Sequence, residues 1–159
     1  MDTREKILSR TGLHEVLEEH RRAGSRVVFA HGVFDVLRAQ DVRFLAAARA
    51  EGDRLVVAVH SDAGVRRAKD ESRTVLTERA RAILVAALAA VDHVILFDET
   101  DIRPLLREFH PDVYACLAGD GLSNGAAELS ALGIRVAAIE LEAMHSTNGH
   151  IARVQGTNG

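Results

Sequence analysis

The sequence predicts a single α/β domain built on a doubly wound, five-stranded parallel sheet. Two observations favour this fold class. Short apolar runs alternate with amphipathic segments along the chain, as in a succession of βα units. The runs are continuously apolar rather than alternating, which is typical of strands buried on both faces of a parallel sheet. These predicted strands lie at 27–30, 55–59, 94–97, 113–116 and 134–139.

Length and composition limit the function classes. The chain has 159 residues, 47% of them hydrophobic and 27% charged, which is the composition of a soluble globular domain with a real core. Its net charge of -3 argues against a nucleic-acid-binding surface. No apolar run approaches the roughly 20 residues of a membrane span. The single cysteine, Cys116, and a charged N-terminus without signal-peptide character predict a cytoplasmic protein.

The first element is a predicted helix over residues 4–22. We expect this helix to be broken near Thr11-Gly12 and to end at Gly24. We treat residues 1–23 as an N-terminal helical segment and residues 24–159 as the α/β domain. The apolar residues at helical spacing are Ile7, Leu8, Leu13, Val16 and Leu17.

A strand, a tight turn and a helix follow. The strand at 27–30 breaks at His31-Gly32, and a helix runs from about residue 38 to 50 with Val42, Leu45 and Ala46 as its apolar positions. In parallel α/β folds the ligand lies over this first turn, at the carboxyl end of the strand. Backbone N–H groups and a helix N-terminus at that point favour phosphate.

The remaining helices alternate with the predicted strands. Ser61 or Asp62 caps a short helix to about residue 67, and a charged loop covers 69–74. Thr77 opens a long helix whose predicted apolar face is Ile83, Leu84, Ala87 and Leu88. Further helices are predicted at 101–109, with Pro104 in the first turn, at 126–132, ended by Gly133, and from 145 to about 155.

The turn carries a family resemblance. Gly32-x-Phe34-Asp35 before a helix resembles the opening of the cytidylyltransferase-like nucleotidyltransferases, and most closely the heptose-phosphate adenylyltransferase and glycerol-phosphate cytidylyltransferase group. That pattern continues with two residues and then H-x-G-H. Val36-Leu37 fit the spacer, but the four signature positions read Arg38-Ala39-Gln40-Asp41. Both histidines and the glycine are therefore absent.

The resemblance extends from about residue 24 to the end of the chain and implies a Rossmann-like nucleotidyltransferase fold and a homodimer. Lys69 falls in a segment similar to the family's basic loop, and Arg79 in the segment that follows it. Gly119-Asp120 resemble the family's glycine-aspartate pair, although the lysine before it is missing. Ser146-Thr147 resemble the pair that opens the last helix and contacts the nucleotide phosphates.

The resemblance also implies a reaction. A small phosphorylated substrate, a sugar or polyol phosphate, attacks the α-phosphorus of CTP or ATP, and pyrophosphate leaves. The protein positions the reactants and stabilises charge, with Mg²⁺ as the implied cofactor. Arg38 can replace part of the first histidine's charge, since a guanidinium binds phosphate bidentately. Asp41 repels a triphosphate unless a metal ion lies between them.

Histidines that are missing from the signature occur at other strand ends. His31 and His60 each follow a predicted strand, and His145 precedes the predicted last helix. Strand ends in this fold meet at one edge, so we expect these residues to converge there with the aspartates of the same edge, forming an acid–base or metal-binding set. The aspartates are Asp35, Asp41 and Asp120.

Three functions follow from these residues. The favoured one is the nucleotidyl transfer just described. The alternatives are a member that binds a nucleotide or metabolite without turnover, and an enzyme with new histidine- or metal-dependent chemistry in the same pocket. The predicted catalytic residues are His31, Arg38, Asp41 and Lys69, with His60 and His145 as an additional site. The predicted nucleotide- or phosphate-binding residues are Gly32, Phe34, Asp35, Arg79, Gly119, Asp120, Ser146 and Thr147.

Overall fold

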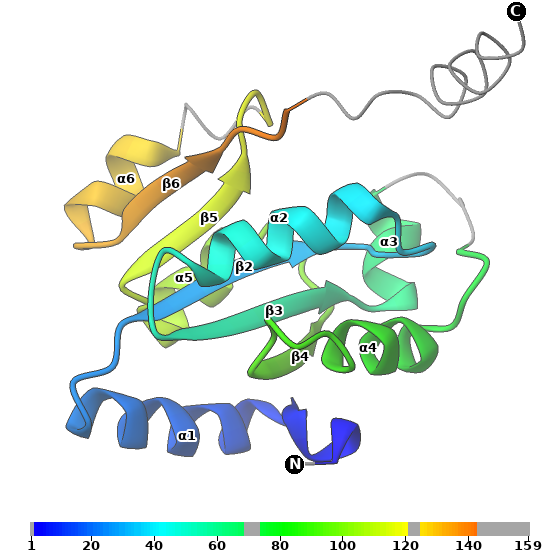
Figure 1. The fold of residues 1–159 in the computed structure, drawn as a ribbon, viewed down its shortest axis with the longest axis horizontal. Helices are drawn as coiled ribbons and strands as arrows, with labels where there is room; N and C mark the ends of the chain where they lie inside the picture. The colour runs from blue at the N-terminus through cyan, green and yellow to red at the C-terminus, as the bar shows by residue number, and fades with distance from the viewer. Residues whose placement is uncertain (1, 69–73, 121–124, 143–159) are drawn as a thin grey trace, which may run out of the picture.

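A computed structural model describes residues 2–68, 74–120 and 125–142 (Figure 1). Six parallel strands form one sheet in the order β1-β4-β3-β2-β5-β6. The strands are β1 (Ile7–Leu8), β2 (Val27–Gly32), β3 (Arg54–His60), β4 (His93–Phe97), β5 (Val113–Leu117) and β6 (Arg135–Ile139). The helices are a short 3₁₀ turn η1 (Thr3–Lys6), α1 (Arg10–Arg22), α2 (Ala39–Arg49), α3 (Asp62–Ala68), α4 (Glu78–Ala86), α5 (Arg103–Phe109) and α6 (Ala126–Ala131).

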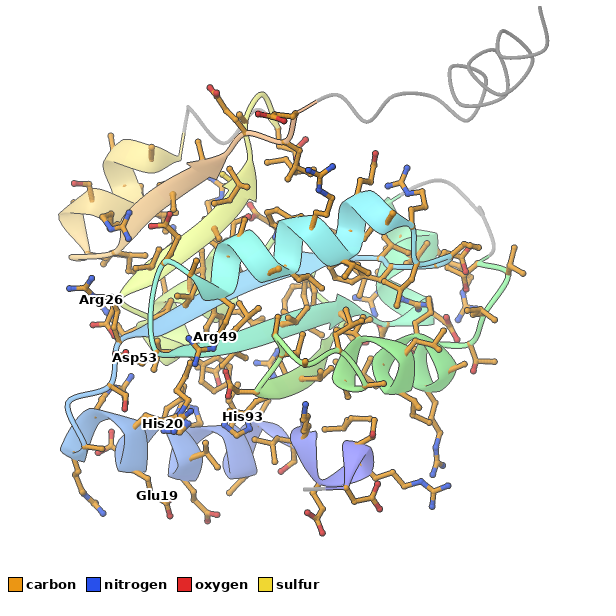
Figure 2. All side chains as sticks on the ribbon, viewed as in Figure 1. Glu19, His20, Arg26, Arg49, Asp53 and His93 are labelled. Carbon is orange, nitrogen blue, oxygen red and sulfur yellow. The ribbon has the colours of Figure 1, made fainter. Side chains whose placement is uncertain are left out.

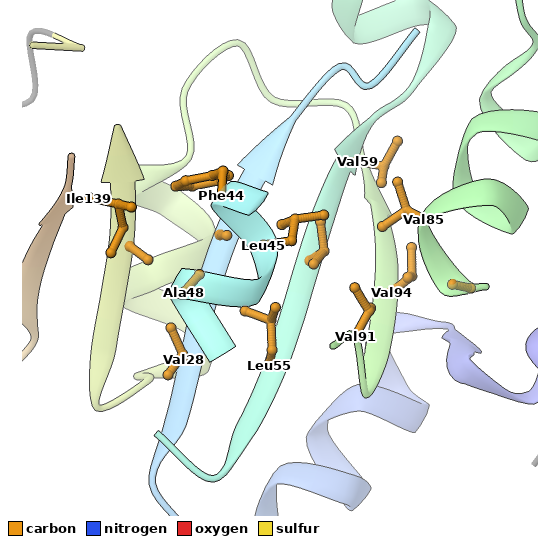
Figure 3. Close-up of a cluster of buried hydrophobic side chains, with 14 of the residues drawn as sticks. Val28, Phe44, Leu45, Ala48, Leu55, Val59, Val85, Val91, Val94 and Ile139 are labelled. Atoms are coloured by element: carbon orange, nitrogen blue, oxygen red, sulfur yellow. The ribbon is translucent and has the colours of Figure 1, made fainter. Parts of the chain in front are cut away.

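Helices cover both faces of the sheet, so the doubly wound α/β class is confirmed. Side chains fill the space between the sheet and the helices on either side (Figure 2). On one face α2 and α4 pack over the central strands; Figure 3 shows Leu45 and Ala48 of α2 above Val28 and Leu55. On the other face α1, α5 and α6 enclose a second apolar cluster around Phe29. Burial on both faces explains why the strands read as continuous apolar runs.

The sheet has one strand more than the sequence predicted. The segment at 4–22 is not one helix broken at Thr11-Gly12, because Ile7 and Leu8 are extended and pair with Val94 and Ile95 of β4. The helix begins only after Ser9, whose side chain accepts the N–H of Gly12. Two apolar residues beside an open strand edge gain ladder hydrogen bonds that a helix start would not give them.

The buried faces of two helices are rotated relative to the prediction. In α2 the buried residues are Phe44, Leu45 and Ala48, whereas Val42 is 41% exposed. In α4 they are Arg81, Ala82, Val85 and Ala86, and Leu84 is 41% exposed. Both helices are rich in alanine, which contributes little area on any face, so their sequence pattern defines the register weakly.

The other expected elements agree with the structure to within about two residues at their ends. Ser61 caps α3 by accepting the N–H of Gly64, and Thr77 caps α4 by accepting that of Ala80. Pro104 lies in the first turn of α5, and Gly133 follows α6 with a φ of 78°. The predicted helix from 145 to 155 lies outside the described residues.

A histidine pair ties α1 to the amino end of β4. Nε2 of His20 lies 3.0 Å from Nε2 of His93, and His93 is buried at the start of β4 (Figure 2). Burial lowers the pKa of both rings; Arg54 lowers that of His20 further, and His20 lowers that of His93. Nearby Asp92 acts in the opposite direction on both. The hydrogen bond needs at least one neutral ring, since two imidazolium ions facing one another repel.

We predict that this pair makes the fold less stable in mild acid. Both pKa values are lowered, so the unfolded chain binds protons more readily than the folded one. The histidine pair therefore stabilises the fold fully above about pH 6.5, and this contribution is lost as the pH falls through the lowered pKa values of the two rings. Urea unfolding at about pH 7.5 and about pH 5.5 should show a smaller pH effect for His93→Phe than for the unaltered protein. His14→Gln, at an exposed histidine of α1, is the matched control. A pH effect in His93→Phe as large as that of the unaltered protein would contradict the prediction.

Candidate functional site

A cavity of about 510 Å³ opens at the carboxyl ends of β2 and β5. From β2 the chain winds outward through β3 and β4 on one side, whereas β5 and β6 lie on the other side. This reversal between neighbouring strands is where open parallel sheets bind ligands, and the volume is within the usual range of ligand sites. The cavity is lined by His31, Gly32, Val33, Phe34, Asp35, Val36, Arg38, Asp41, Phe44, Val65, Thr74, Tyr114, Ala115, Cys116, Leu117 and Asp120.

The turn after β2 forms one wall of this cavity. Phe34 has a φ of 52°, and its ring folds back over Gly32. A Cβ on residue 32 would lie 2.9 Å from that ring, so a larger residue there would push the ring aside. The structure thus places Gly32 and Phe34 at the cavity, where the sequence predicted ligand-binding residues.

Asp35 connects the turn to the segment that precedes α4. Its two carboxylate oxygens accept the backbone N–H groups of Val75 and Leu76, each at 2.9 Å. These two hydrogen bonds, that of Leu76 first, lower the pKa of Asp35. Asp35 lines the cavity, and its carboxylate also anchors the segment that follows Thr74, another lining residue.

The two altered signature positions pair with each other. The backbone N–H of Arg38 donates to Asp41 at 2.9 Å, and its guanidinium donates to the same carboxylate at 3.2 Å through both Nε and Nη2. Asp41 thereby raises the pKa of Arg38 and closes the first turn of α2. Both side chains line the cavity, and their charges offset each other. The pair therefore supplies less positive charge than Arg38 alone would.

A fully buried arginine that the sequence analysis missed holds the cavity walls together. Arg81 is 0% exposed and donates at 2.7 Å to the carbonyl oxygens of Val33 and His60. It also donates to the Leu76 carbonyl at 3.3 Å and to Asp62 at 2.8 Å. One side chain thus joins the turn after β2, the end of β3, the start of α3 and the segment before α4.

Arg79, which the sequence predicted to bind phosphate, does not line the cavity. It is exposed and lies beside a separate shallow groove with Arg4, Ile7 and Ile83. The error has the same origin as the rotated face of α4, because the inward position belongs to residue 81. The sequence would have pointed to Arg81 instead of Arg79 if the buried face of α4 had been assigned correctly.

The expected meeting of His31 and His60 is observed. Their ring centroids lie 5.7 Å apart, and the His60 ring lies 4.1 Å from that of Phe97. Nδ1 of His31 is 2.8 Å from the hydroxyl oxygen of Tyr114, a second residue that the sequence analysis missed. Burial, and then the neighbouring His60, lower the pKa of His31 to about 4. His31 is therefore a neutral hydrogen-bonding group near pH 7 and not a cation for phosphate.

The remaining predicted residues are placed as follows. Asp120 lines the cavity, and Gly119 before it has a φ of 92°. Lys69, His145, Ser146 and Thr147 lie outside the described residues.

Within residues 2–68, 74–120 and 125–142, no three His, Cys, Asp or Glu side chains are arranged to hold a metal ion. The same part of the chain has no helix long and apolar enough to cross a membrane.

Comparison with known families decides what this arrangement is. The family described as cytidylyltransferase-like matches residues 29–134, which includes the turn, the cavity and all central strands. The chain belongs to the cytidylyltransferase-like family. The resemblance drawn from Gly32-x-Phe34-Asp35 is thereby confirmed.

Curated relatives of this cytidylyltransferase-like chain include proteins named bifunctional protein HldE. That of Wolinella succinogenes is 36% identical over 156 residues, which cover 98% of this chain and 32% of the relative. That of Rhodopseudomonas palustris strain TIE-1 is 49% identical over 110 residues, covering 69% of this chain and 22% of the relative. The chain thus spans about a third or less of the length of these relatives.

Solved structures agree with the fold. The lipopolysaccharide core biosynthesis protein from Thermoplasma volcanium GSS1 is 27% identical, with a TM-score of 0.64 over 77% of this chain and 100% of the other. A pantoate-beta-alanine ligase from Francisella tularensis, solved with beta-gamma ATP and beta-alanine, has a TM-score of 0.65 over 87% of this chain and 67% of the other. At 12% identity the second likeness concerns the fold alone.

We predict that Arg81→Lys strongly destabilises this cytidylyltransferase-like domain. A lysine cannot reach all four acceptors, so buried carbonyl groups and the partly buried Asp62 carboxylate lose their partners. A buried carbonyl group that is left without its donor typically costs about 1–3 kcal/mol, and urea denaturation should show a loss of at least that size in the free energy of unfolding. Arg79→Lys, at an exposed position of the same helix, should change it by less than about 0.5 kcal/mol. Equal effects of the two substitutions would contradict the role given to Arg81.

Proposed function

We propose that this chain is a nucleotidyltransferase with an altered phosphate site. It transfers a nucleotidyl group from ATP or CTP to a small phosphorylated sugar or polyol and releases pyrophosphate. The observation that carries the proposal is the cavity over the turn from Gly32 to Asp41, at the switch point of a cytidylyltransferase-like sheet. A homodimer and a cytoplasmic location belong to the same proposal and rest on the resemblance and on composition.

The reaction needs no covalent intermediate on the protein. An oxygen of the acceptor's phosphate forms a bond to the α-phosphorus, and the bond from that phosphorus to the bridging oxygen of pyrophosphate breaks. The products are pyrophosphate and a nucleoside diphosphate joined to the sugar or polyol. The protein contributes by aligning the two phosphates in the cavity and by offsetting their charge.

The described residues of the cavity lack positive charge for this task. Asp35, Asp41 and Asp120 face a single arginine, Arg38, which is already paired. We therefore propose that Mg²⁺ enters with the triphosphate, since this ion is usually held by substrate phosphates together with one or two carboxylates. The Arg38 side chain is 65% exposed and can turn to a phosphate while Asp41 keeps the backbone N–H at residue 38.

A second candidate is binding of a nucleotide or phosphorylated metabolite without turnover. The pairing of Arg38 with Asp41 favours it, because Asp41 holds the guanidinium at one signature position and itself donates no hydrogen bond at the other. Loss of one charge-stabilising donor typically lowers a rate by about 10²–10³, and here two are replaced.

Pyrophosphate release separates the two candidates. The purified protein is incubated with ATP or CTP, Mg²⁺ and a panel of sugar and polyol phosphates. Release that requires both a triphosphate and one acceptor supports the transferase. A triphosphate that binds but yields no pyrophosphate with any acceptor supports the second candidate.

We predict that restoring the signature raises transfer. The variant Arg38→His/Gln40→Gly/Asp41→His returns two histidines and the glycine to their family positions. Pyrophosphate release should rise by at least about 10²-fold, because each donor is typically worth about that factor. Arg43→His, at an exposed position of α2 outside the cavity, is the matched control and should give no increase. A restored variant that binds triphosphate yet shows no gain would count against the proposed reaction.

A further inference from the structure

His31 and Tyr114 form a hydrogen-bonded dyad in the cavity floor. Tyr114 lies early in β5 opposite Phe29 of β2, and His31 follows Phe29 by two residues, so both side chains lie on the α1 and α5 side of the sheet. His31 lines the cavity, and the Tyr114 side chain is fully buried. Neither residue belongs to the turn that carries the signature positions.

Tyr114 determines which nitrogen of His31 carries the proton. Within the described residues the only partner of the tyrosine hydroxyl is Nδ1 of His31, at 2.8 Å. If Nδ1 carried a hydrogen and donated it, the buried O–H of Tyr114 would point at no acceptor, which is costly. The hydroxyl therefore donates to Nδ1, and the imidazole keeps its hydrogen on Nε2. No described residue accepts from that Nε2–H.

The charges around the dyad are unfavourable for phosphate. Asp101 and Asp120 both raise the pKa of Tyr114, and Asp120 also raises that of Cys116, after the larger effect of burial. Asp101 is paired with Arg103, so Asp120 is the carboxylate that makes the potential at the cavity floor negative. The arginine of the described cavity, Arg38, lies at the start of α2 instead. An anionic ligand is consequently oriented with its phosphates toward Arg38 and its uncharged end toward His31.

We propose that the dyad is a nucleoside subsite, in which the Nε2–H of His31 donates to an uncharged acceptor on the base and Tyr114 acts as the positioning residue. This proposal rests on the proposed function, because it takes a nucleoside triphosphate as the ligand. It explains why a partly buried, neutral histidine directly precedes a turn suited to phosphate. A cationic group at this place would draw the phosphates away from Arg38.

The test compares ligands with and without a base. Binding of ATP, CTP and inorganic tripolyphosphate, each with Mg²⁺, is measured by calorimetry for the unaltered protein, Tyr114→Phe, His31→Phe and the double variant. Tyr114→Phe should weaken ATP or CTP about three- to tenfold and leave tripolyphosphate unchanged, as expected for one hydrogen bond to the uncharged end. In the His31→Phe background it should have no further effect, because Tyr114 acts through His31.

A second readout needs no ligand. The ¹⁵N shifts of the His31 ring should show an unprotonated Nδ1 and a protonated Nε2, and Tyr114→Phe should mix the two tautomers while the signals of His20 and His93 stay unchanged. A protonated Nδ1, unchanged ATP and CTP affinity in Tyr114→Phe, or an equal loss for tripolyphosphate would each overturn the proposal. If the ring shows the expected tautomer but neither ATP nor CTP binds the unaltered protein, the proposed function fails and the nucleoside subsite fails with it, whereas the dyad geometry stands.

Discussion

The buried guanidinium of Arg81 is the interaction on which the cavity depends. Its guanidinium joins the turn after β2 to the end of β3, the start of α3 and the segment before α4. The turn holds Phe34 in a left-handed backbone conformation, which costs free energy, so contacts from outside the turn must stabilise it. Arg81 and Asp35 both tie the turn to the segment before α4. The chain's own hydrogen bonds therefore hold the cavity walls.

The residues that shape the cavity differ from those that determine its charge. The fold, the turn and the cavity are those of a cytidylyltransferase-like protein, whereas the charge at the signature positions is not. Arg38 and Asp41 offset each other at the start of α2. Under the proposed function, a triphosphate in this cavity would rely on Mg²⁺ and on a displaced Arg38, and we expect the cost to appear in the rate of transfer more than in the geometry of binding.

The sequence predicted the features that depend on local pattern. Continuous apolar runs located five strands, and the parallel arrangement brought His31 and His60 to one edge. It missed β1, because a strand of two residues has no periodicity and exists only through its pairing with β4. It missed Arg81 because a cation in a helix is normally exposed, and its partners are 5 to 48 residues away. The sequence indicated only that Tyr114 belongs to a buried strand, because its hydrogen-bond partner, His31, is 83 residues away.

The central claim is that the altered cavity still accepts a nucleoside triphosphate. Calorimetric titration of the protein with ATP, CTP, GTP and UTP, with and without Mg²⁺, tests it most directly. The account predicts magnesium-dependent binding of ATP or CTP at one site per chain, because the described cavity residues carry too little positive charge to hold a triphosphate alone. Absence of binding for all four triphosphates in the presence of Mg²⁺ would contradict it.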